Sequence, residues 1–224
     1  ADYAREPLLS DNGLVWHDAP STSLDTDILR PAGDPHAPNG GLRMLDGNLG
    51  KAVIKISAVA EERRLIEAPA AVFEDEAAVK ASYAAGTLDR DVVVVVRGQG
   101  PQATGMPELH SLTPMLSNLQ DKGHAVALVT DGRMSGASGN VPAATHVMPE
   151  AVAGGPIGRV ADGDVIRLDA VAGSLDIDAD LNSRAPFGPT NSAPQRGFAR
   201  PLFSALRAAA GSAEQGAGLH SPET

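Results

Sequence analysis

The sequence contains no cysteine among its 224 residues. A chain without thiols cannot form a disulfide, cannot use a thiolate nucleophile and cannot bind an iron–sulfur cluster through its own side chains. A cytoplasmic protein is therefore the default expectation.

Long apolar segments are also absent. No run approaches the roughly 20 residues that a membrane-spanning helix needs, and the first residues lack the basic and apolar segments of a secretory signal. Nothing indicates secretion or a membrane span. The chain begins "ADYAREPLLS", without an initiator methionine, so we expect a domain cut from a longer protein.

Positive charge is scarce. The chain has 18 Lys and Arg against 28 Asp and Glu, a formal net charge of 18 − 28 = −10. Because this balance repels a phosphate backbone, nucleic-acid binding is not expected. The length is sufficient to bury a core, either as one large domain or as a domain with irregular flanks.

The chain divides into three regions by composition. Residues 1–40 are rich in Pro, Gly, Ser and Asp and show no sustained period, which predicts a loop-like linker, or an arm that packs on a missing N-terminal domain. Residues 41–210 hold the periodic segments and are expected to form the domain. Residues 211–224 are expected to be a flexible tail. We find no internal repeat.

Apolar periodicity predicts an α/β domain with a partly parallel sheet. The residues 91–97, "DVVVVVR", form an unbroken β-branched run of the kind buried on both faces of a sheet. The other strands expected here are 51–59, 68–73 and 124–131, and the helices are 74–86 and 106–123, the second bent or divided at Pro114.

The last third indicates antiparallel structure that completes a mixed sheet or barrel. Leu175 and Ile177 alternate with aspartates, as in a half-exposed strand, and Asp162–Gly163 is a turn signal. A short helix is expected over 201–210.

The loop "VTDGRMSGASGN", residues 129–140, follows the strand 124–131 at its carboxyl end, where open α/β sheets usually bind ligands. Gly132, Gly136 and Gly139 permit close backbone approach, and Ser135 and Ser138 supply hydroxyls. The loop lacks the spacing of a P-loop. Its composition fits an anion cradle or a plain tight connection, and spacing alone leaves both open.

A second glycine-rich segment, residues 98–110, follows the strand 91–97, so the two loops are expected to share one rim of the sheet. Glu108 lies in this segment. It is either a carboxylate favoured by a helix start or a hard oxygen ligand for Mg²⁺.

The remaining polar candidates carry weaker signals. His110, His124 and His146 have no zinc-ligand spacing, and His146 is expected to be a structural hydrogen bonder. Asp131 could cap its loop or orient Arg133. Asp46 and Asn48, in "LDGNLG", are expected to form a turn, a role that is favoured over catalysis for both.

Five ordered segments carry a family resemblance. The segments "LDGNLGKAVIK", "FEDEAAV", "GPQATGMPELHSLTPML", "ALVTDGRMSGASGNVPAATHVMPEA" and "GRVADGDVIRLD" resemble the dihydroxy-acid and sugar-acid dehydratases, an iron–sulfur lyase family. The resemblance covers roughly residues 5 to 218. It implies the smaller C-terminal domain of that family, a swivelling β/β/α, barrel-like, mixed-sheet domain with flanking helices, and it accounts for the missing cysteines.

The resemblance also implies roles for individual residues. Ser135 would be the catalytic base and Glu108 the one Mg²⁺ ligand of this domain. The iron–sulfur cluster and the other Mg²⁺ ligands would belong to the missing N-terminal domain, so the fragment alone would be inactive. The expected substrate-binding residues are Asp131, Gly132, Arg133, Gly136, Ser138 and Gly139.

The combination of "GMPELHSLTP" with "SGASGNVPAA" looks most like the 6-phosphogluconate branch. That branch implies dehydration of 6-phosphogluconate to 2-keto-3-deoxy-6-phosphogluconate in the Entner–Doudoroff pathway, by a full-length enzyme that forms a homodimer. Asn140 stands where many relatives are expected to have a basic residue, which leaves the phosphate contact open. Two alternatives remain: another sugar acid or dihydroxy acid as substrate, or a free-standing swivelling module that binds an anion without catalysis.

Overall fold

The structure, a computed structural model, describes residues 5–135, 139–188 and 203–219. The chain forms two compact units, Ala1–Gly40 and Gly41–Thr224. Within the described ranges, no helix is both long and apolar enough to cross a membrane.

The first unit contains a β-hairpin where a loop was expected. Strands β1 (Arg5–Ser10) and β2 (Gly13–Asp18) pair antiparallel, with Arg5 opposite Asp18 and Ser10 opposite Gly13. The turn between them falls at Asp-Asn-Gly, a hairpin signal that the loop-rich surroundings obscured. The loop-like expectation was therefore wrong for this segment, whereas turns and bends follow as far as Gly40. Its role as linker or arm stays a prediction.

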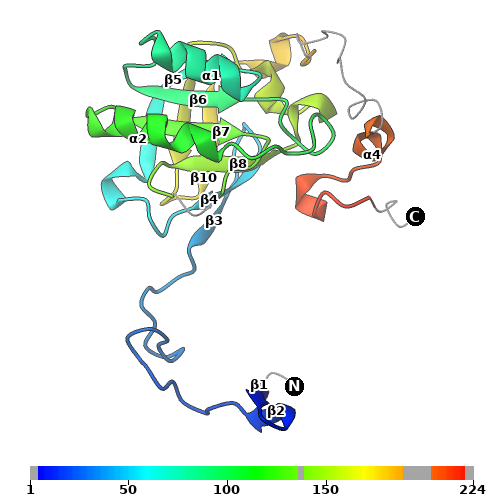
Figure 1. The fold of residues 1–224 in the computed structure, drawn as a ribbon. Coiled ribbons are helices and arrows are strands. Elements are labelled where there is room, and N and C mark those ends of the chain that lie inside the picture. Colours follow the sequence, from blue (N-terminus) through cyan, green and yellow to red (C-terminus); the bar gives the residue numbers. More distant parts are fainter. Residues whose placement is uncertain (1–4, 136–138, 189–202, 220–224) are drawn as a thin grey trace. The chain divides into compact units, whose positions relative to one another are not determined.

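A mixed sheet builds the second unit (Figure 1). Its eight strands among the described residues follow the order β10-β9-β5-β6-β7-β8-β4-β3. They are β3 (Leu42–Leu45), β4 (Lys51–Lys55), β5 (Leu65–Phe73), β6 (Val92–Val96), β7 (Val126–Thr130), β8 (Ala143–Met148), β9 (Val165–Asp169) and β10 (Ser174–Asp178). The strands β5 to β8 run parallel, and the flanking pairs are antiparallel. The predicted partly parallel sheet is confirmed.

Strand β6 consists of five valines and lies in the middle of the strand order. All five residues of β6 are buried, because one face of the strand packs into the barrel core and the other packs against the helices. The two apolar clusters on these faces share this strand: Val93 and Val95 belong to the first, Val92, Val94 and Val96 to the second. An unbroken β-branched run suits such a position, since neither face needs polar residues.

The sheet is nearly closed into a barrel by the turn after β3. The Nδ2 of Asn48 donates to the carbonyl of Ile177 at 2.9 Å, and its Oδ1 accepts from the Ile177 N–H at 2.7 Å. The N–H of Leu49 also donates to the carbonyl of Leu175 at 3.3 Å. These bonds join the β3 end of the sheet to β10, the strand at its other edge. The expected turn role of Asn48 is confirmed, and so is the barrel-like fold class.

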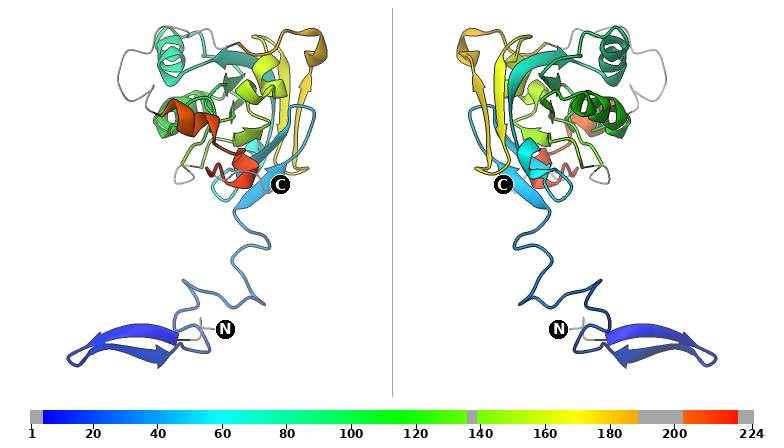
Figure 2. Two further views of the ribbon diagram at one scale, coloured as in Figure 1. Left: turned by 90° about the vertical axis from the view of Figure 1, so that its right-hand side faces the viewer. Right: turned by 90° about the vertical axis from the view of Figure 1, so that its left-hand side faces the viewer.

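Two helices cover the outer face of the parallel strands (Figures 1 and 2). Helix α1 (Glu76–Ala84) begins at Asp75, whose carboxylate accepts the Ala78 N–H at 2.7 Å as an N-cap. Helix α2 (Thr113–Asp121) follows a 3-10 turn over His110–Leu112. The expectation of one helix over 106–123, bent or divided at Pro114, was wrong for residues 106–109, which are not helical. The 3-10 turn gives way to α2 next to Pro114, because proline fits the first turn of a helix.

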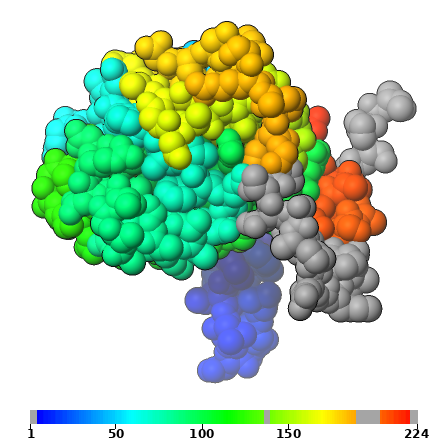
Figure 3. Space-filling model, turned by 90° about the horizontal axis from the view of Figure 1, so that it is seen from above, coloured from blue at the N-terminus to red at the C-terminus, as the bar shows by residue number. Residues whose placement is uncertain are grey.

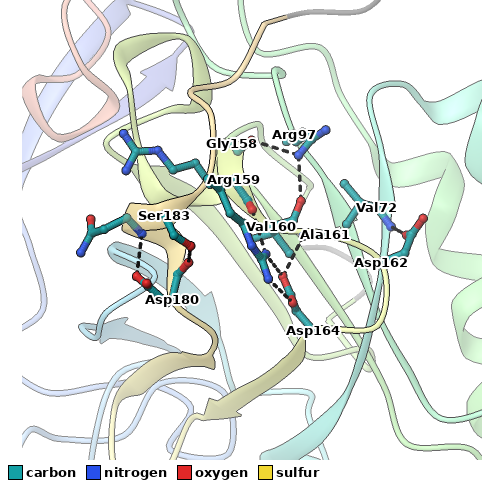
Figure 4. Close-up of polar contacts among 12 residues, drawn as sticks. Val72, Arg97, Gly158, Arg159, Val160, Ala161, Asp162, Asp164, Asp180 and Ser183 are labelled. Carbon is teal, nitrogen blue, oxygen red and sulfur yellow. Dashed lines mark hydrogen bonds and ion pairs between the residues drawn. The ribbon is translucent and has the colours of Figure 1, made fainter.

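The segment between β8 and β9 is held by side chains that bind backbone carbonyls and amides (Figure 4). The Nη1 of Arg97, just after β6, donates to Gly158 O at 3.0 Å and to Val160 O at 2.8 Å. Asp164 accepts the Ala161 N–H and pairs with the guanidinium of Arg184, which lowers the pKa of that carboxyl. These contacts fix the connection that brings the chain back to the antiparallel edge.

The antiparallel edge agrees with the alternation read in the sequence. Leu175 and Ile177 are buried, whereas Asp178 is exposed. The signal at Asp162–Gly163 marks the turn into β9, and the β9–β10 hairpin turn comes later, before Ser174. From above, β9 and β10 in yellow and orange form one continuous surface with the region around α1 (Figure 3).

The C-terminal segment packs on the same unit. Helix α4 (Ser204–Ala208) ends before residue 210, the expected end of a helix over 201–210. Residues 201 and 202 lie outside the described residues. In the predicted tail, Ala213–Gln215 form a 3-10 turn near β8, and Glu214 lies 3.6 Å from the Lys51 ammonium. Among these described residues, the segment and the loop after β6 line a largely apolar groove of about 450 Å³.

Candidate functional site

The two glycine-rich loops begin at the same edge of the sheet. Strands β6 and β7 are parallel neighbours, with Val96 opposite Thr130, so the segments after them leave the sheet side by side. The loops meet again further on, where Glu108 and Arg133 form a parallel bridge and the Leu109 N–H donates to Arg133 O at 3.1 Å. The predicted shared rim is present in the structure.

Glu108 and Ser135 are in direct contact on this rim. The Ser135 backbone N–H donates to Glu108 Oε1 at 2.6 Å, and the His110 N–H donates to the same oxygen at 3.0 Å. Two amide donors therefore hold one carboxylate oxygen and leave Oε2 directed elsewhere. The Glu108 side chain is 36% exposed, so this carboxylate is accessible from outside the domain.

Arg133 lies across the same contact. Its Nε donates to the carbonyl of Met106 at 2.8 Å, and its Nη1 lies 3.7 Å from Glu108 Oε2. More than half of its side chain is exposed, at 54%. A guanidinium with this much exposed surface can still bind an anion.

Asp131 is a buried support for the loops. The residue is only 1% exposed, and its carboxylate accepts three backbone N–H groups, from Gly98 at 3.1 Å, Gln99 at 2.8 Å and Ala151 at 2.9 Å. Burial raises the pKa of this carboxyl, and the N–H donors oppose that rise. It ties together the segments after β6, β7 and β8. Direct contact of Asp131 with a substrate stays a prediction.

Gly132 is required by the closeness of the two loops. A Cβ at this position would lie 2.7 Å from the Cβ of Gln99 and 3.1 Å from its carbonyl oxygen. Its amide donates to Thr130 Oγ1 at 2.9 Å, and its carbonyl accepts the His146 N–H at 2.9 Å. Only glycine fits here without moving a neighbour.

The rest of the predicted loop is partly outside the described residues. Gly136 and Ser138 fall in the range 136–138, of which nothing is described. Gly139 is buried and borders a cavity between the loop and the sheet. The Nδ2 of Asn140 donates to Ser117 Oγ on α2 at 2.8 Å, so this side chain attaches the loop to the helix.

Two residues near the rim, Glu150 and His146, have positions in the structure that the sequence did not predict. Glu150 is buried and accepts the N–H groups of Gln102 at 3.0 Å and Ala103 at 3.2 Å, which fixes the loop that leads to Glu108. Burial raises the pKa of its carboxyl. The sequence did not single out Glu150 as a site residue. Its only signal was that a carboxylate stands beside apolar residues, in the segment "THVMPEA".

His146 is the second such residue. Its backbone has a φ of 55°, which is uncommon for a non-glycine residue. Burial, and then the charge of Arg133, lower the pKa of its imidazole. The other two candidate histidines lie elsewhere: His110 begins the 3-10 turn before α2, and His124 Nε2 lies 2.8 Å from Asp89 Oδ1.

A metal ion could take one ligand from this rim. Across the ranges that the structure describes, no group of three or more His, Asp or Glu side chains could hold a metal ion together. Glu108 is accessible, has a hard oxygen ligand to offer, and is aligned by amide donors, as metal-bound carboxylates commonly are. The rim therefore fits a single donated ligand of a site whose other ligands lie elsewhere.

Comparison with known proteins shows the family to which the chain is similar. Residues 27–217 match the family described as dihydroxy-acid/6-phosphogluconate dehydratase C-terminal. The chain is 54% identical over 218 residues to a phosphogluconate dehydratase of Pseudomonas aeruginosa and 50% identical over 218 residues to one of Escherichia coli strain K12, in each case with 96% of this chain and 36% of the relative covered.

A more distant relative carries another name. A dihydroxy-acid dehydratase of Pyrococcus furiosus is 40% identical over 186 residues, which are 75% of this chain and 33% of that protein. The chain thus spans about a third of the length of these curated relatives. The match over 27–217 and these identities show that the chain belongs to the dihydroxy-acid/6-phosphogluconate dehydratase family, within its C-terminal domain.

Proposed function

We propose that this chain is the C-terminal part of a hydro-lyase that dehydrates 6-phosphogluconate to 2-keto-3-deoxy-6-phosphogluconate, a step of the Entner–Doudoroff pathway. The observation that carries the proposal is the contact between Ser135 and Glu108. This contact supports the proposal because the residue proposed as base lies next to the residue proposed as metal ligand, in a chain about 50% identical to proteins named phosphogluconate dehydratase.

The reaction needs one proton removed and one hydroxyl expelled. Ser135, as alkoxide, takes the proton from C2, and the C2–H electrons form the C2–C3 double bond. The C3 hydroxyl leaves as water with the proton that Ser135 has taken from C2, which returns Ser135 to its alkoxide form. The resulting enol tautomerises at C3 to the 2-keto acid, so substrate and product differ by one water molecule.

A serine needs help to act as a base, because its hydroxyl is a weak acid until nearby positive charge stabilises the alkoxide. In this chain Arg133 pairs with Glu108 and offsets the negative charge of the carboxylate beside Ser135. The positive charge that stabilises the alkoxide would come from the bound metal groups. Gly132 lets the loop lie close to the segment after β6, and Gly139 borders a cavity between the loop and the sheet. We propose that the loop 131–139 binds the substrate in this way, with Gly136 and Ser138 as further contacts.

Glu108 is the residue of this chain that would hold Mg²⁺. When bound, Mg²⁺ and an iron–sulfur cluster would supply Lewis-acid stabilisation of the substrate carboxylate and of the leaving hydroxyl. This chain has no cysteine, so the cluster would be bound by an N-terminal domain of the same protein. Asp131 and Glu150 contribute by fixing the loops that carry the site.

The proposal includes partners. The N-terminal cluster-binding domain would cover the rim, and the full-length protein would form a homodimer. No nucleic acid or membrane is part of the proposal, and the cytoplasmic location stays a prediction. The rim of this chain and the cluster-binding domain would then form the complete site only in the full-length protein.

The test is turnover by purified full-length protein loaded with cluster and Mg²⁺. Formation of the 2-keto acid is measured with 6-phosphogluconate, with D-gluconate and with a branched dihydroxy acid. We expect 6-phosphogluconate to have the highest kcat/KM. A preference for the branched acid would support the second candidate, which the dihydroxy-acid dehydratase relative favours. A gene without an upstream cysteine-bearing domain would instead favour the non-catalytic anion-binding module.

A further inference from the structure

The hairpin β1–β2, drawn in blue in Figures 1 and 2, belongs to a unit without a core. Residues 5–40 are all described, and none of them is buried. The unit nevertheless has large apolar side chains, and these are exposed: Leu8, Leu9, Leu14, Val15, Trp16, Leu24, Ile28 and Leu29. A two-stranded hairpin is at best marginally stable in water by itself. The unit therefore needs a second surface against which it can bury these side chains.

The register of the hairpin gathers apolar residues on one of its faces. Residues paired across two antiparallel strands lie on the same face, and successive pairs alternate between the two faces. The first face carries the pairs Arg5–Asp18, Pro7–Trp16 and Leu9–Leu14. The second face carries the pairs Glu6–His17, Leu8–Val15 and Ser10–Gly13. We call the first the apolar face, because two successive apolar pairs fill it up to one charged pair.

The apolar face has the composition of an interface. Leu9, Leu14 and Trp16 are 81%, 61% and 50% exposed, and Trp16 is the only tryptophan of the chain. At the end of the face, Arg5 Nε lies 3.8 Å from Asp18 Oδ1, and Arg5 Nη2 donates to the Trp16 carbonyl at 2.8 Å. An apolar centre with an aromatic anchor, bordered by paired charges, is typical of a surface that binds another protein surface.

Charge argues against a second copy of this unit as the partner. Residues 1–40 hold two Arg and seven Asp or Glu, and 2 − 7 = −5 is half of the net charge of the whole chain. Two such units would repel each other if their hairpins packed face to face. The surface that covers the apolar face is therefore expected to be apolar at its centre and neutral or basic around it.

The length of the relatives indicates where such a surface lies. The match to the phosphogluconate dehydratase of Pseudomonas aeruginosa leaves 100 − 96 = 4% of this chain outside it, about nine of 224 residues, so strand β2 is within the match. The same match leaves 100 − 36 = 64% of the relative outside it. Residues of the hairpin are thus shared with a protein that has a much longer chain on which they can pack.

We propose that the apolar face of the hairpin docks on the N-terminal domain of the full-length protein. The inference rests on the proposed function for the existence of that domain. The docked hairpin buries Trp16, Leu9 and Leu14, and it anchors this chain to the N-terminal domain in addition to the rim that carries Glu108 and Ser135.

Photo-cross-linking of the full-length protein identifies what covers the face. Leu9, on the apolar face, is replaced by p-benzoylphenylalanine in one protein, and Leu8, on the opposite face, in another. Cross-linked peptides are then identified by mass spectrometry. Position 9 is expected to cross-link to peptides upstream of Ala1, with a higher yield than position 8.

Hydrogen exchange of the full-length protein measures how firmly the hairpin is docked. Leu9→Gln and Leu8→Gln are matched variants, because each removes one leucine of β1 and one apolar cross-strand pair. The readout is exchange from β2, whose sequence is the same in both. Loss of an interface anchor commonly changes a binding equilibrium by about tenfold or more. Leu9→Gln should therefore speed the exchange of the β2 amides by about tenfold, and Leu8→Gln by much less.

The proposal is overturned if position 9 cross-links to residues 5–18 of a second copy, to residues 41–219 of the chain, or to no peptide at all. Equal exchange from β2 in the two variants would also contradict it, because the apolar face would then be no more covered than the other. Neither measurement uses turnover. A wild-type protein that dehydrates no sugar acid would refute the proposed function and leave the docking result unaffected.

Discussion

The backbone N–H of Ser135 donates to the Oε1 of Glu108 over 2.6 Å, which joins the loops that follow two neighbouring strands. Because the bond uses the amide, the Ser135 hydroxyl is not needed to hold the carboxylate. The side chains of both residues can therefore be changed separately, and each change should test one role.

Replacing Ser135 by alanine in the full-length protein should lower kcat by about 10²- to 10⁴-fold, the usual contribution of a general base. The amide bond to Glu108 remains, so the Tm and the cluster absorbance should be unchanged. Ser111→Ala is the control, since Ser111 is exposed on the 3-10 turn before α2. Near-normal turnover by the Ser135 variant would remove this residue from the mechanism.

Replacing Glu108 by glutamine should raise the Mg²⁺ concentration for half-maximal activity by at least about tenfold. Changes in the surroundings of metal ligands already cost about 10- to 100-fold in affinity. Glutamine keeps an oxygen that can accept the two amide donors, so the loop should stay in place. Glu67→Gln, an exposed carboxylate paired with Arg167 on β9, is the control. The same Mg²⁺ dependence in both variants would mean that Glu108 only accepts hydrogen bonds.

Replacing Gly132 by alanine should destabilise the chain by about 1–3 kcal/mol, the usual cost of overpacking. The added Cβ would lie 2.7 Å from the Cβ of Gln99, so the two loops must separate, and turnover should fall as well. Urea unfolding and the activity of the full-length protein measure the two effects. Gly188→Ala is the control, because a Cβ there meets nothing within 4 Å. Equal stability of the two variants would contradict the close packing of the loops.

Replacing Asp164 by asparagine should cost about 1–3 kcal/mol of unfolding free energy at pH 7, because the bonds to Arg184 are charge-assisted. Arg184 holds the folded pKa of Asp164 below the ordinary value of 3.8. The stabilisation is therefore fully present above that value and is lost as the pH falls through the lower, folded pKa.

The gap in stability between wild type and Asp164→Asn should accordingly be larger at pH 7 than at pH 3. Urea unfolding of the chain at both pH values measures it. Asp178→Asn, which removes an exposed carboxylate of β10, should change stability by no more than about 0.5 kcal/mol. A gap that does not shrink on acidification would show that the ion pair adds nothing to stability.

Local signals predicted much of this fold. The β-branched run of β6 and the alternation of Leu175 and Ile177 depend on which faces a strand buries, and both are confirmed. The wrong predictions came from residues whose types are compatible with more than one local structure. Pro114 was expected to bend or divide a helix over 106–123, yet it stands in the first turn of α2. The hairpin over 5–18 was missed because loop-forming residues surround it.

The sequence by itself determined the family, the mixed α/β class and the two loops in which the site was expected, because these follow from residue types and their spacing. Only the tertiary structure decided which groups meet. The contact of Ser135 with Glu108 crosses 27 positions, and the triple amide clamp on Asp131 joins three separate segments. The left-handed His146 results from an extra residue in β8. Such contacts depend on strand register and chain closure, which no local pattern encodes.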